Sequence, residues 1–218
     1  MKKMSSSTEI KAIVFDMGGV LVDLDMDRCR HHFIDKLGYK DIDNILDACH
    51  QKGIYSDLEG GTMSPEDFRK EILNGCNPGT TDKDVDEAMQ SLLVGIEPYK
   101  SELLRDLSAK YDLYMLSNNN SISFARSRAM FEEAGIPVET TFRHLFLSYE
   151  MKMLKPSAEI YLSSIEYIGL PAENLLFIDD SQANIDAARS CGMNVLYYKQ
   201  GDDLKSALQK AIGDCAQW

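Results

Sequence analysis

Five side chains that could together handle a phosphate group and a metal ion are spread along this sequence of 218 residues: Asp16, Ser117, Lys155, Asp179 and Asp180. Carboxylates that lie close together repel one another unless a cation sits between them, and their hard oxygens suit Mg²⁺. A hydroxyl group and backbone amides at a turn from strand to helix bind phosphate oxygens, and a lysine neutralises the charge of a phosphoryl group in transfer. A carboxylate held against that group can itself attack it and form an aspartyl phosphate. These residue types predict phosphoryl chemistry if the fold brings them together.

The first of these side chains follows an apolar run that is typical of a buried strand. Residues 12–15, Ala-Ile-Val-Phe, are rich in β-formers, which is the pattern of a strand covered on both faces of a parallel sheet. Asp16 comes directly after them, and Gly18 and Gly19 let the backbone bend and approach a metal or a phosphate closely. A carboxylate at the carboxyl end of a central parallel strand lies where open α/β sheets bind their ligands. Taken alone, Asp16 would be no more than a turn residue.

From about residue 98 onward, patterns typical of strands alternate with patterns typical of helices. Such alternation predicts crossover connections and a parallel sheet with helices on its faces. The strands are expected over 113–116, 144–148, 175–178 and 194–198, and the helices over 98–110, 121–134, 156–168, 181–190 and 203–212.

The remaining polar side chains follow these predicted strands. Ser117 comes directly after the first of them, and Asp179 and Asp180 come after the third. Lys155 stands at the expected start of the helix that follows the second. Because the carboxyl ends of parallel strands lie at one edge of a sheet, these groups are expected to converge there with Asp16.

The section between the first strand and residue 98 has a different pattern. From about residue 27 to residue 97, apolar residues recur at helical spacing, and glycine-rich segments separate the runs. This pattern predicts a small helical bundle inserted after the first strand.

The composition argues against several classes of partner. Asp and Glu outnumber Lys and Arg by 35 to 23, and the formal net charge of −12 argues against nucleic acid or an anionic membrane. No stretch approaches the length of a membrane span, and the first eight residues, expected to be a disordered tail, lack the apolar region of a secretory signal. Five scattered cysteines, none at Cys-x-x-Cys spacing, predict free thiols in a reducing cytoplasm instead of disulfides or a zinc site.

The segments that carry the candidate residues resemble the four sequence motifs of the haloacid dehalogenase (HAD) superfamily. The motifs are VFDMGGVLVD with Asp16, YMLSNNN with Ser117, MLKPSAEIY with Lys155 and FIDDSQANIDAA with Asp179 and Asp180. They occur in the family's order and with family-like spacing. Within the superfamily, the first two motifs are most similar to those of the sugar-phosphate phosphatases that act on glucose 1-phosphate. The segments that carry this similarity are FDMGGVLVDLD and LSNNN.

The position of the insert resembles that of the C1-capped members of the superfamily. The resemblance implies a Rossmann-like α/β core formed by residues 1–23 and 99–218, a parallel sheet flanked by helices. Residues 24–98 would form an inserted helical-bundle cap. Closing such a cap excludes bulk water and admits only small substrates.

The resemblance also implies which residues bind the metal. Asp16 would be both the nucleophile and a Mg²⁺ ligand, and the backbone carbonyl of Gly18 would be a second ligand. Asp180 would be a third ligand, with Asp179 supporting it.

Another group of residues would bind the substrate. Ser117 and the Asn118 amide would hold the phosphoryl oxygens, and Lys155 would bridge the phosphoryl group and the nucleophile. Residues 54–61 of the insert resemble the cap loop that faces the substrate in such enzymes. Within that segment, Tyr55 and Glu59 are expected to select the substrate.

The sequence departs from the usual family pattern at Gly18. Most phosphatases of this superfamily carry an Asp there, which acts as general acid for the leaving group and then as general base for water. Metal binding needs only the carbonyl, but acid–base catalysis, typically worth ~10²–10⁴-fold, lacks its usual group. Asp23 and Asp25 follow shortly after Gly18 in the same segment, and either could supply the missing acid–base group. The glucose 1-phosphate phosphatases resembled here also have Gly at this place, which favours an active enzyme.

The sequence therefore predicts a Mg²⁺-dependent phosphatase that hydrolyses a small phosphorylated metabolite, such as a sugar phosphate, through an aspartyl phosphate. Two alternatives stay open: a 2-haloacid dehalogenase or phosphonatase-like hydrolase, and a catalytically weakened protein that binds phosphate for regulation. A monomer or homodimer in the cytoplasm is expected, with neither nucleic acid nor a membrane as partner.

Overall fold

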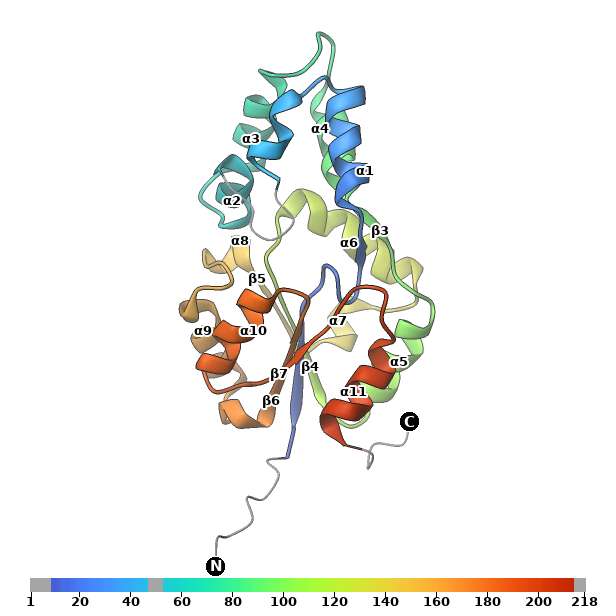
Figure 1. Cartoon of the computed structure of the whole chain (residues 1–218), viewed down its shortest axis with the longest axis vertical. Helices are drawn as coiled ribbons and strands as arrows, with labels where there is room; N and C mark the ends of the chain where they lie inside the picture. The colour runs from blue at the N-terminus through green and yellow to red at the C-terminus, as the bar shows by residue number, and fades with distance from the viewer. Residues whose placement is uncertain (1–8, 47–52, 214–218) are drawn as a thin grey trace, which may run out of the picture.

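The fold is built on a five-stranded parallel sheet (Figure 1). The structure is a computed structural model that describes residues 9–46 and 53–213, so the expected tail of residues 1–8 lies outside the described residues. The strands run in the order β5-β4-β1-β6-β7, and every neighbouring pair is parallel. Their bounds are β1 Ala12–Phe15, β4 Asp112–Ser117, β5 His144–Leu147, β6 Leu175–Asp179 and β7 Asn194–Tyr197. The predicted parallel sheet with a central first strand is confirmed.

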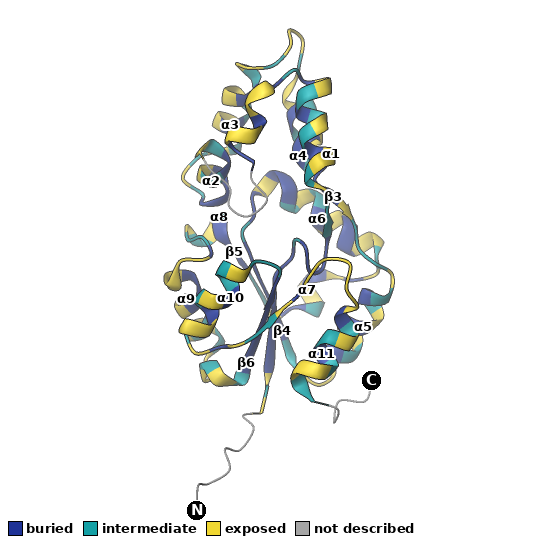
Figure 2. Ribbon diagram, viewed as in Figure 1, coloured by how far each residue is buried: buried dark blue, intermediate teal, exposed yellow. Residues whose placement is uncertain are grey.

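Helices cover both faces of this sheet, and the central strands β4, β1 and β6 between them are almost entirely buried (Figure 2). Along β1, Ile13 and Phe15 point into one apolar cluster, whereas Ala12 and Val14 point into the other. This alternation is the strand period of two, with both faces apolar as the continuous run predicts. The first cluster is covered by α5 Tyr99–Ser108, α6 Ser121–Glu133, α7 Val138–Thr141 and α11 Leu204–Ile212, and the second by α9 Ala158–Ile168 and α10 Gln182–Ser190.

A separate group of helices stands above the carboxyl edge of the sheet (Figure 1). It has its own apolar cluster, in which Phe33, Phe68 and Met89 are fully buried. Side chains fix where two of the helices begin: Ser64 caps α3 and Thr81 caps α4. The helices are α1 Met26–His31, the π-helix η1 His32–Lys36, the 3-10 helix η2 Lys40–Asn44, α2 Gly53–Glu59, α3 Pro65–Leu73 and α4 Asp82–Gln90.

A short antiparallel pair connects this bundle to the sheet. β2 Asp23–Leu24 leads into the bundle and pairs with β3 Leu93–Gly95, which leads out of it. The sequence did not predict this pair, because two or three residues are too few to show a period. The bundle also packs onto the rest of the fold through α4 against α6 and through α2 against α8 Ser148–Met151.

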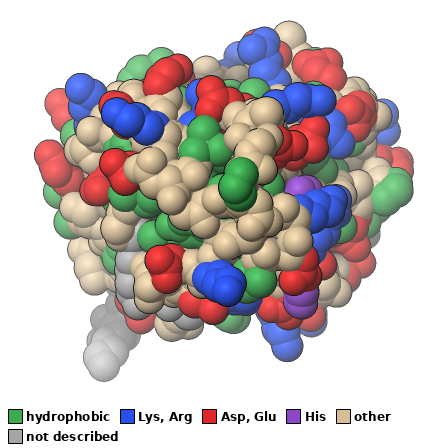
Figure 3. Space-filling view, turned by 90° about the horizontal axis from the view of Figure 1, so that it is seen from above, with side chains coloured by type: hydrophobic (Ala, Val, Ile, Leu, Met, Phe, Trp, Pro, Cys, Tyr) green, Lys and Arg blue, Asp and Glu red, His purple; other side chains and the backbone are tan. Residues whose placement is uncertain are grey.

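The surface of the bundle carries both signs of charge. Viewed from above the bundle, Lys and Arg side chains are interspersed with Asp and Glu side chains (Figure 3). No helix among the described residues combines the length and the apolar character that crossing a membrane would require.

Candidate active site

The candidate residues meet at the carboxyl edge of the sheet because of the strand order. β1 lies between β4 and β6, so Asp16, which follows β1, has Ser117 on one side and Asp179 on the other. The register is fixed by the backbone, since the Asp16 N–H donates to the Ile178 carbonyl at 2.8 Å. The strand order reverses beside β1, and such a switch point is where open α/β sheets bind ligands.

Lys155 bridges two of the carboxylates. Its Nζ lies 2.9 Å from Asp16 Oδ1 and 2.7 Å from Asp179 Oδ2. Burial alone would lower the pKa of Lys155, but Asp16 and Asp179 together hold it above its usual value. The ammonium group therefore stays charged in the site, where it can neutralise an anion.

The side chain of Asn118 fixes the segment that carries this lysine. The Lys155 N–H donates to Asn118 Oδ1 at 2.8 Å, and Asn118 Nδ2 donates to the Lys155 carbonyl at 3.0 Å. These two bonds join the end of β4 to the segment before α9. The side chain of Asn118 thus positions Lys155, a role that the sequence did not predict because the two residues lie far apart in the chain. Ser117 is almost fully buried, and it borders the same cavity as Asn118 and Lys155.

The carboxylates of Asp16, Asp179 and Asp180 form an acidic cluster. Each offers one oxygen, and these oxygens all lie within 4.8 Å of one another. Burial, with the charges of Asp179 and Asp180, raises the pKa of Asp16 to about 8 despite the opposing charge of Lys155. Burial and the charge of Asp179 raise the pKa of Asp180 to about 6. A divalent cation between these groups would relieve the repulsion.

The geometry of this cluster fits Mg²⁺. The ion binds oxygens at about 2.1 Å, so its ligands lie roughly 3–4 Å apart and the cluster needs only a small adjustment. Gly18 borders the same cavity, and no hydrogen bond to its carbonyl oxygen occurs among the described residues. Asp179 is already held by Lys155, by the Ser181 N–H at 2.8 Å and by Asn184 Nδ2 at 2.9 Å. Asp179 is therefore better placed to support the ligands than to turn toward the ion.

A cavity of about 690 Å³ opens between the carboxyl edge of the sheet and the helices above it. Two residues from the bundle, Tyr55 and Glu59, border it together with Asp16 and Lys155. Both are buried, with exposed fractions of 2% and 7%. They belong to α2, whereas the resemblance to a cap loop placed them in a loop.

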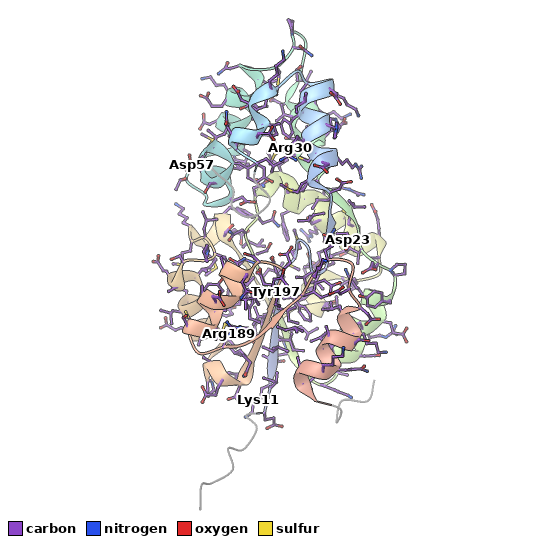
Figure 4. The ribbon with its side chains drawn as sticks, in the orientation of Figure 1. Lys11, Asp23, Arg30, Asp57, Arg189 and Tyr197 are labelled. Atoms are coloured by element: carbon purple, nitrogen blue, oxygen red, sulfur yellow. The ribbon has the colours of Figure 1, made fainter. Side chains whose placement is uncertain are left out.

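Asp23 and Asp25 do not border this cavity. Asp23 lies at the junction of sheet and bundle (Figure 4). Its Oδ1 is 3.4 Å from Lys100 Nζ. Asp25 caps α1 by accepting the Arg28 N–H at 2.8 Å. These contacts do not support the alternative that either residue replaces the acid–base group missing at Gly18.

Two further polar side chains that the sequence did not single out face the cavity. Asn120 Nδ2 and Ser123 Oγ are buried near the Tyr55 hydroxyl group, whose pKa both act to lower, but neither makes a hydrogen bond of normal geometry with a described residue. Asn120 caps α6 with its Oδ1, which accepts the Ser123 N–H at 2.9 Å. The sequence Asn-x-x-Ser indicates a helix start, but it does not reveal that two donors are left free beside a cavity.

The comparisons with known proteins agree with this geometry. A D-ribitol-5-phosphate phosphatase of Bacteroides thetaiotaomicron is 34% identical, over 91% of this chain and 97% of its own length. A sesquiterpene phosphatase of Aspergillus oryzae is 26% identical, over 94% of this chain and 98% of its own length.

Solved structures are similar along almost the whole chain. A HAD-family enzyme of Bacteroides thetaiotaomicron, in complex with magnesium and inorganic phosphate, has a TM-score of 0.86 at 36% identity and covers 91% of this chain and 98% of its own. A predicted HAD-like hydrolase of Porphyromonas gingivalis has a TM-score of 0.82 at 30% identity and covers 92% of this chain and 97% of its own.

The family itself is shown by a match over most of the sequence. The profile described as haloacid dehalogenase-like hydrolase matches residues 10–192. The fold and the hydrolase class predicted from the sequence agree with it. The chain therefore belongs to the haloacid dehalogenase-like hydrolase family.

Proposed function

We propose that this chain is a Mg²⁺-dependent phosphomonoesterase that works through an aspartyl phosphate on Asp16. The observation that carries the proposal is the position of the Asp16 carboxylate. It borders the cavity, with the Lys155 ammonium group 2.9 Å away on one side and the acidic cluster on the other. The similarity to named phosphatases, and to an enzyme solved with magnesium and phosphate, supports the same reading.

The metal would be held by Asp16, the Gly18 carbonyl and Asp180, with Asp179 as support. When bound, Mg²⁺ supplies positive charge that draws the phosphoryl group toward Asp16 and offsets charge developing on its oxygens. Three clustered carboxylates, two of them buried, favour this chemistry over a metal-free dehalogenation, because without a cation they would repel one another.

The chain's own residues would perform the transfer. The Asp16 carboxylate attacks phosphorus, and the bond between phosphorus and the leaving oxygen breaks. Lys155 and Ser117, with the Asn118 amide, hold the phosphoryl oxygens while the charge shifts. Water then attacks phosphorus, phosphate leaves, and the Asp16 carboxylate is restored.

The helical bundle would act as the cap over this site. Residues 24–98 have their own apolar cluster and are joined to the remainder through the β2–β3 pair, which supports a cap of residues 24–98 on a core of residues 1–23 and 99–218. Such a cap limits the size of the substrate and removes bulk water during the reaction.

The substrate would be the phosphate ester of a small sugar or sugar alcohol. A buried donor without a partner costs about 1–3 kcal/mol, so Asn120 Nδ2 and Ser123 Oγ favour a ligand with hydroxyl groups. Tyr55 and Glu59 border the same part of the cavity and would contribute to selection. The ribitol 5-phosphate named for the bacterial relative fits this requirement better than a sesquiterpene phosphate, and glucose 1-phosphate is a further candidate.

A screen of phosphate release tests the proposal. Ribitol 5-phosphate, glucose 1-phosphate and other sugar and sugar alcohol phosphates are incubated with the wild-type protein and with Asp16→Asn, each with Mg²⁺ or with EDTA. The expected result is release from at least one substrate by the wild-type protein with Mg²⁺ only. Equal release by Asp16→Asn, or release that EDTA leaves unchanged, would contradict the proposal.

A further inference from the structure

A phosphomonoesterase that lacks a side chain at Gly18 needs a proton for its leaving oxygen from another group. Among residues 9–46 and 53–213, the ionisable side chains that border the cavity are Asp16, Tyr55, Glu59, Lys155 and Asp180. In the proposed function Asp16 attacks phosphorus and Asp180 binds the metal, while Lys155 is held by two carboxylates. Glu59 and Tyr55 are left without a chemical role.

The Glu59 carboxyl group is buried but has no partner. It is 7% exposed and borders the cavity, and it makes no hydrogen bond with any described residue. It borders the same cavity as Asp16 and Lys155, and the charges of both act on its pKa. A carboxyl group left free at such a place can reach a ligand.

The backbone of Glu59 is tied to the sheet edge. Ser148 Oγ donates to the Glu59 carbonyl at 2.6 Å and accepts the Asn119 N–H at 2.9 Å. The backbone just after the helix also packs closely against the sheet edge. A Cβ atom at Gly61 would lie 2.2 Å from the Tyr149 carbonyl oxygen. These contacts fix the end of α2 against the segment that follows β4, which bears Ser117.

The shift in the pKa of the Glu59 side chain suits a proton donor. Burial, with the charge of Asp16, raises the pKa of Glu59 to about 8 despite the opposing charge of Lys155. The charged and titratable groups that face Glu59 are these two and Tyr55 on its own helix, whose pKa burial raises well above its usual value. Burial is the largest cause of the rise in the pKa of Glu59, and it favours the carboxylic acid form that a proton donor needs.

We propose that Glu59 is the general acid and base of the reaction, in place of the side chain that Gly18 lacks. The inference rests on the proposed phosphatase function. In the first step Asp16 attacks phosphorus, the bond from phosphorus to the leaving oxygen breaks, and that oxygen takes the proton of the Glu59 carboxyl group. In the second step the Glu59 carboxylate takes a proton from water as the water oxygen attacks phosphorus. The Asp16–phosphate bond breaks, so Asp16 is restored as a carboxylate and Glu59 as an acid.

The leaving group decides whether a general acid is needed, and it gives the test. An alkoxide, as from ribitol 5-phosphate, must be protonated as it leaves, whereas p-nitrophenolate is a stable anion that leaves without a proton. In Glu59→Gln, ribitol 5-phosphate turnover is expected to fall by about 10²–10⁴-fold. With p-nitrophenyl phosphate, the variant is expected to keep the first burst of nitrophenolate, one per site. Turnover should then stall with phosphate on Asp16, because no base remains to take a proton from the water that hydrolyses the aspartyl phosphate.

A matched variant controls for charge and folding. Asp57→Asn removes a carboxylate from the exposed side of the same helix, and Asp57 does not border the cavity (Figure 4). It is expected to turn over both substrates within about twofold of wild type. Thermal unfolding and Mg²⁺ titration of Glu59→Gln establish that the variant is folded and binds the ion.

Three results would overturn the inference. Ribitol 5-phosphate turnover of Glu59→Gln within about threefold of wild type would exclude the role. An equal loss of the burst and of ribitol 5-phosphate turnover would assign Glu59 to positioning instead, as would a variant that no longer folds or binds Mg²⁺. In all three cases the phosphatase proposal stands as long as the wild-type protein releases phosphate and Asp16→Asn does not. A wild-type protein inactive on every phosphate ester of the screen and on p-nitrophenyl phosphate would instead remove the proposed function and this inference with it.

Discussion

The Asp180 carboxylate lies directly against Gly19. A Cβ atom at residue 19 would lie 2.0 Å from Asp180 Oδ2. Gly19 also adopts a φ of +72°, a backbone angle that residues with a side chain rarely adopt. The acidic cluster therefore depends on the absence of a side chain at residue 19 as much as on its own carboxylates.

Replacing Gly19 with Ala tests this relationship. We expect Gly19→Ala to push Asp180 out of the cluster and to weaken Mg²⁺ binding by about 10–100-fold, the usual effect of disturbing the support of a metal ligand. Gly169→Ala is the matched control, because Gly169 has the same φ of +72° and nothing lies within 4 Å of its Cβ position. Both variants should lose about 1–2 kcal/mol of stability from the backbone conformation. Calorimetric titration with Mg²⁺ would contradict the prediction if both variants bound the ion alike.

Lys155 compensates the charge of the acidic cluster, so its removal should destabilise the metal-free protein. Lys155→Met leaves Asp16 and Asp179 buried without their cation, and loss of one partner from a buried pair costs about 3–5 kcal/mol. Urea unfolding in EDTA measures this cost, and saturating Mg²⁺ should recover part of it. Lys152→Met, three residues away and exposed, should change stability by less than about 0.5 kcal/mol. Equal stability of the two variants in EDTA would be the contrary result.

The burial of Glu59 should make the stability of the metal-free protein fall as pH rises. Its pKa is raised from about 4.5 to about 8, so between these values the folded state binds more protons than the unfolded state. The stabilisation is complete below pH 4.5 and is lost as pH rises through 8. Glu59→Gln does not titrate, so its melting temperature relative to wild type should rise by several degrees from pH 5 to pH 9.

Asp57→Asn serves as the control for this pH series. It removes the same charge from the exposed side of α2. A pH slope of the same size in both variants would show that the effect is not due to burial of Glu59.

The free donors at the start of α6 should act on substrate affinity alone. Removing Ser123 Oγ, which has no partner among the described residues, should leave the unliganded protein as stable as before or slightly more so. Loss of a hydrogen bond of about 1 kcal/mol should raise KM for a sugar alcohol phosphate about fivefold at unchanged kcat. The control is Ser127→Ala, whose hydroxyl instead donates to the Ser123 carbonyl at 3.0 Å. A fall in kcat of Ser123→Ala at constant KM would be inconsistent with this role.

Most of the α/β fold could be predicted because its strands are continuous apolar runs. The run of residues 12–15 is buried on both faces, so its residue types alone indicate a central strand. The helix of residues 156–168 was expected two residues early, because Ser157 and not Lys155 caps it. The β2–β3 pair escaped prediction, because its two segments are apart in sequence and too short for a pattern.

The candidate site could be predicted only as far as residue type and strand order determine it. The meeting of Asp16, Ser117 and Asp179 follows from three neighbouring strand ends, so the order of the strands suffices. The contacts of the Asn118 side chain with Lys155, and of Ser148 with Glu59, join segments far apart in sequence. No local pattern reveals them, because each depends on how loops and helices pack in three dimensions.

The central claim is that the phosphoryl group passes through Asp16, and acid-quenched turnover followed by peptide mass spectrometry tests it most directly. Wild-type protein is mixed with Mg²⁺ and p-nitrophenyl phosphate, quenched during turnover and digested, and the peptide that contains Asp16 is weighed. The account predicts one added phosphate on this peptide, placed on Asp16 by fragmentation and absent without Mg²⁺. Steady release of nitrophenolate while this peptide never carries phosphate would contradict it.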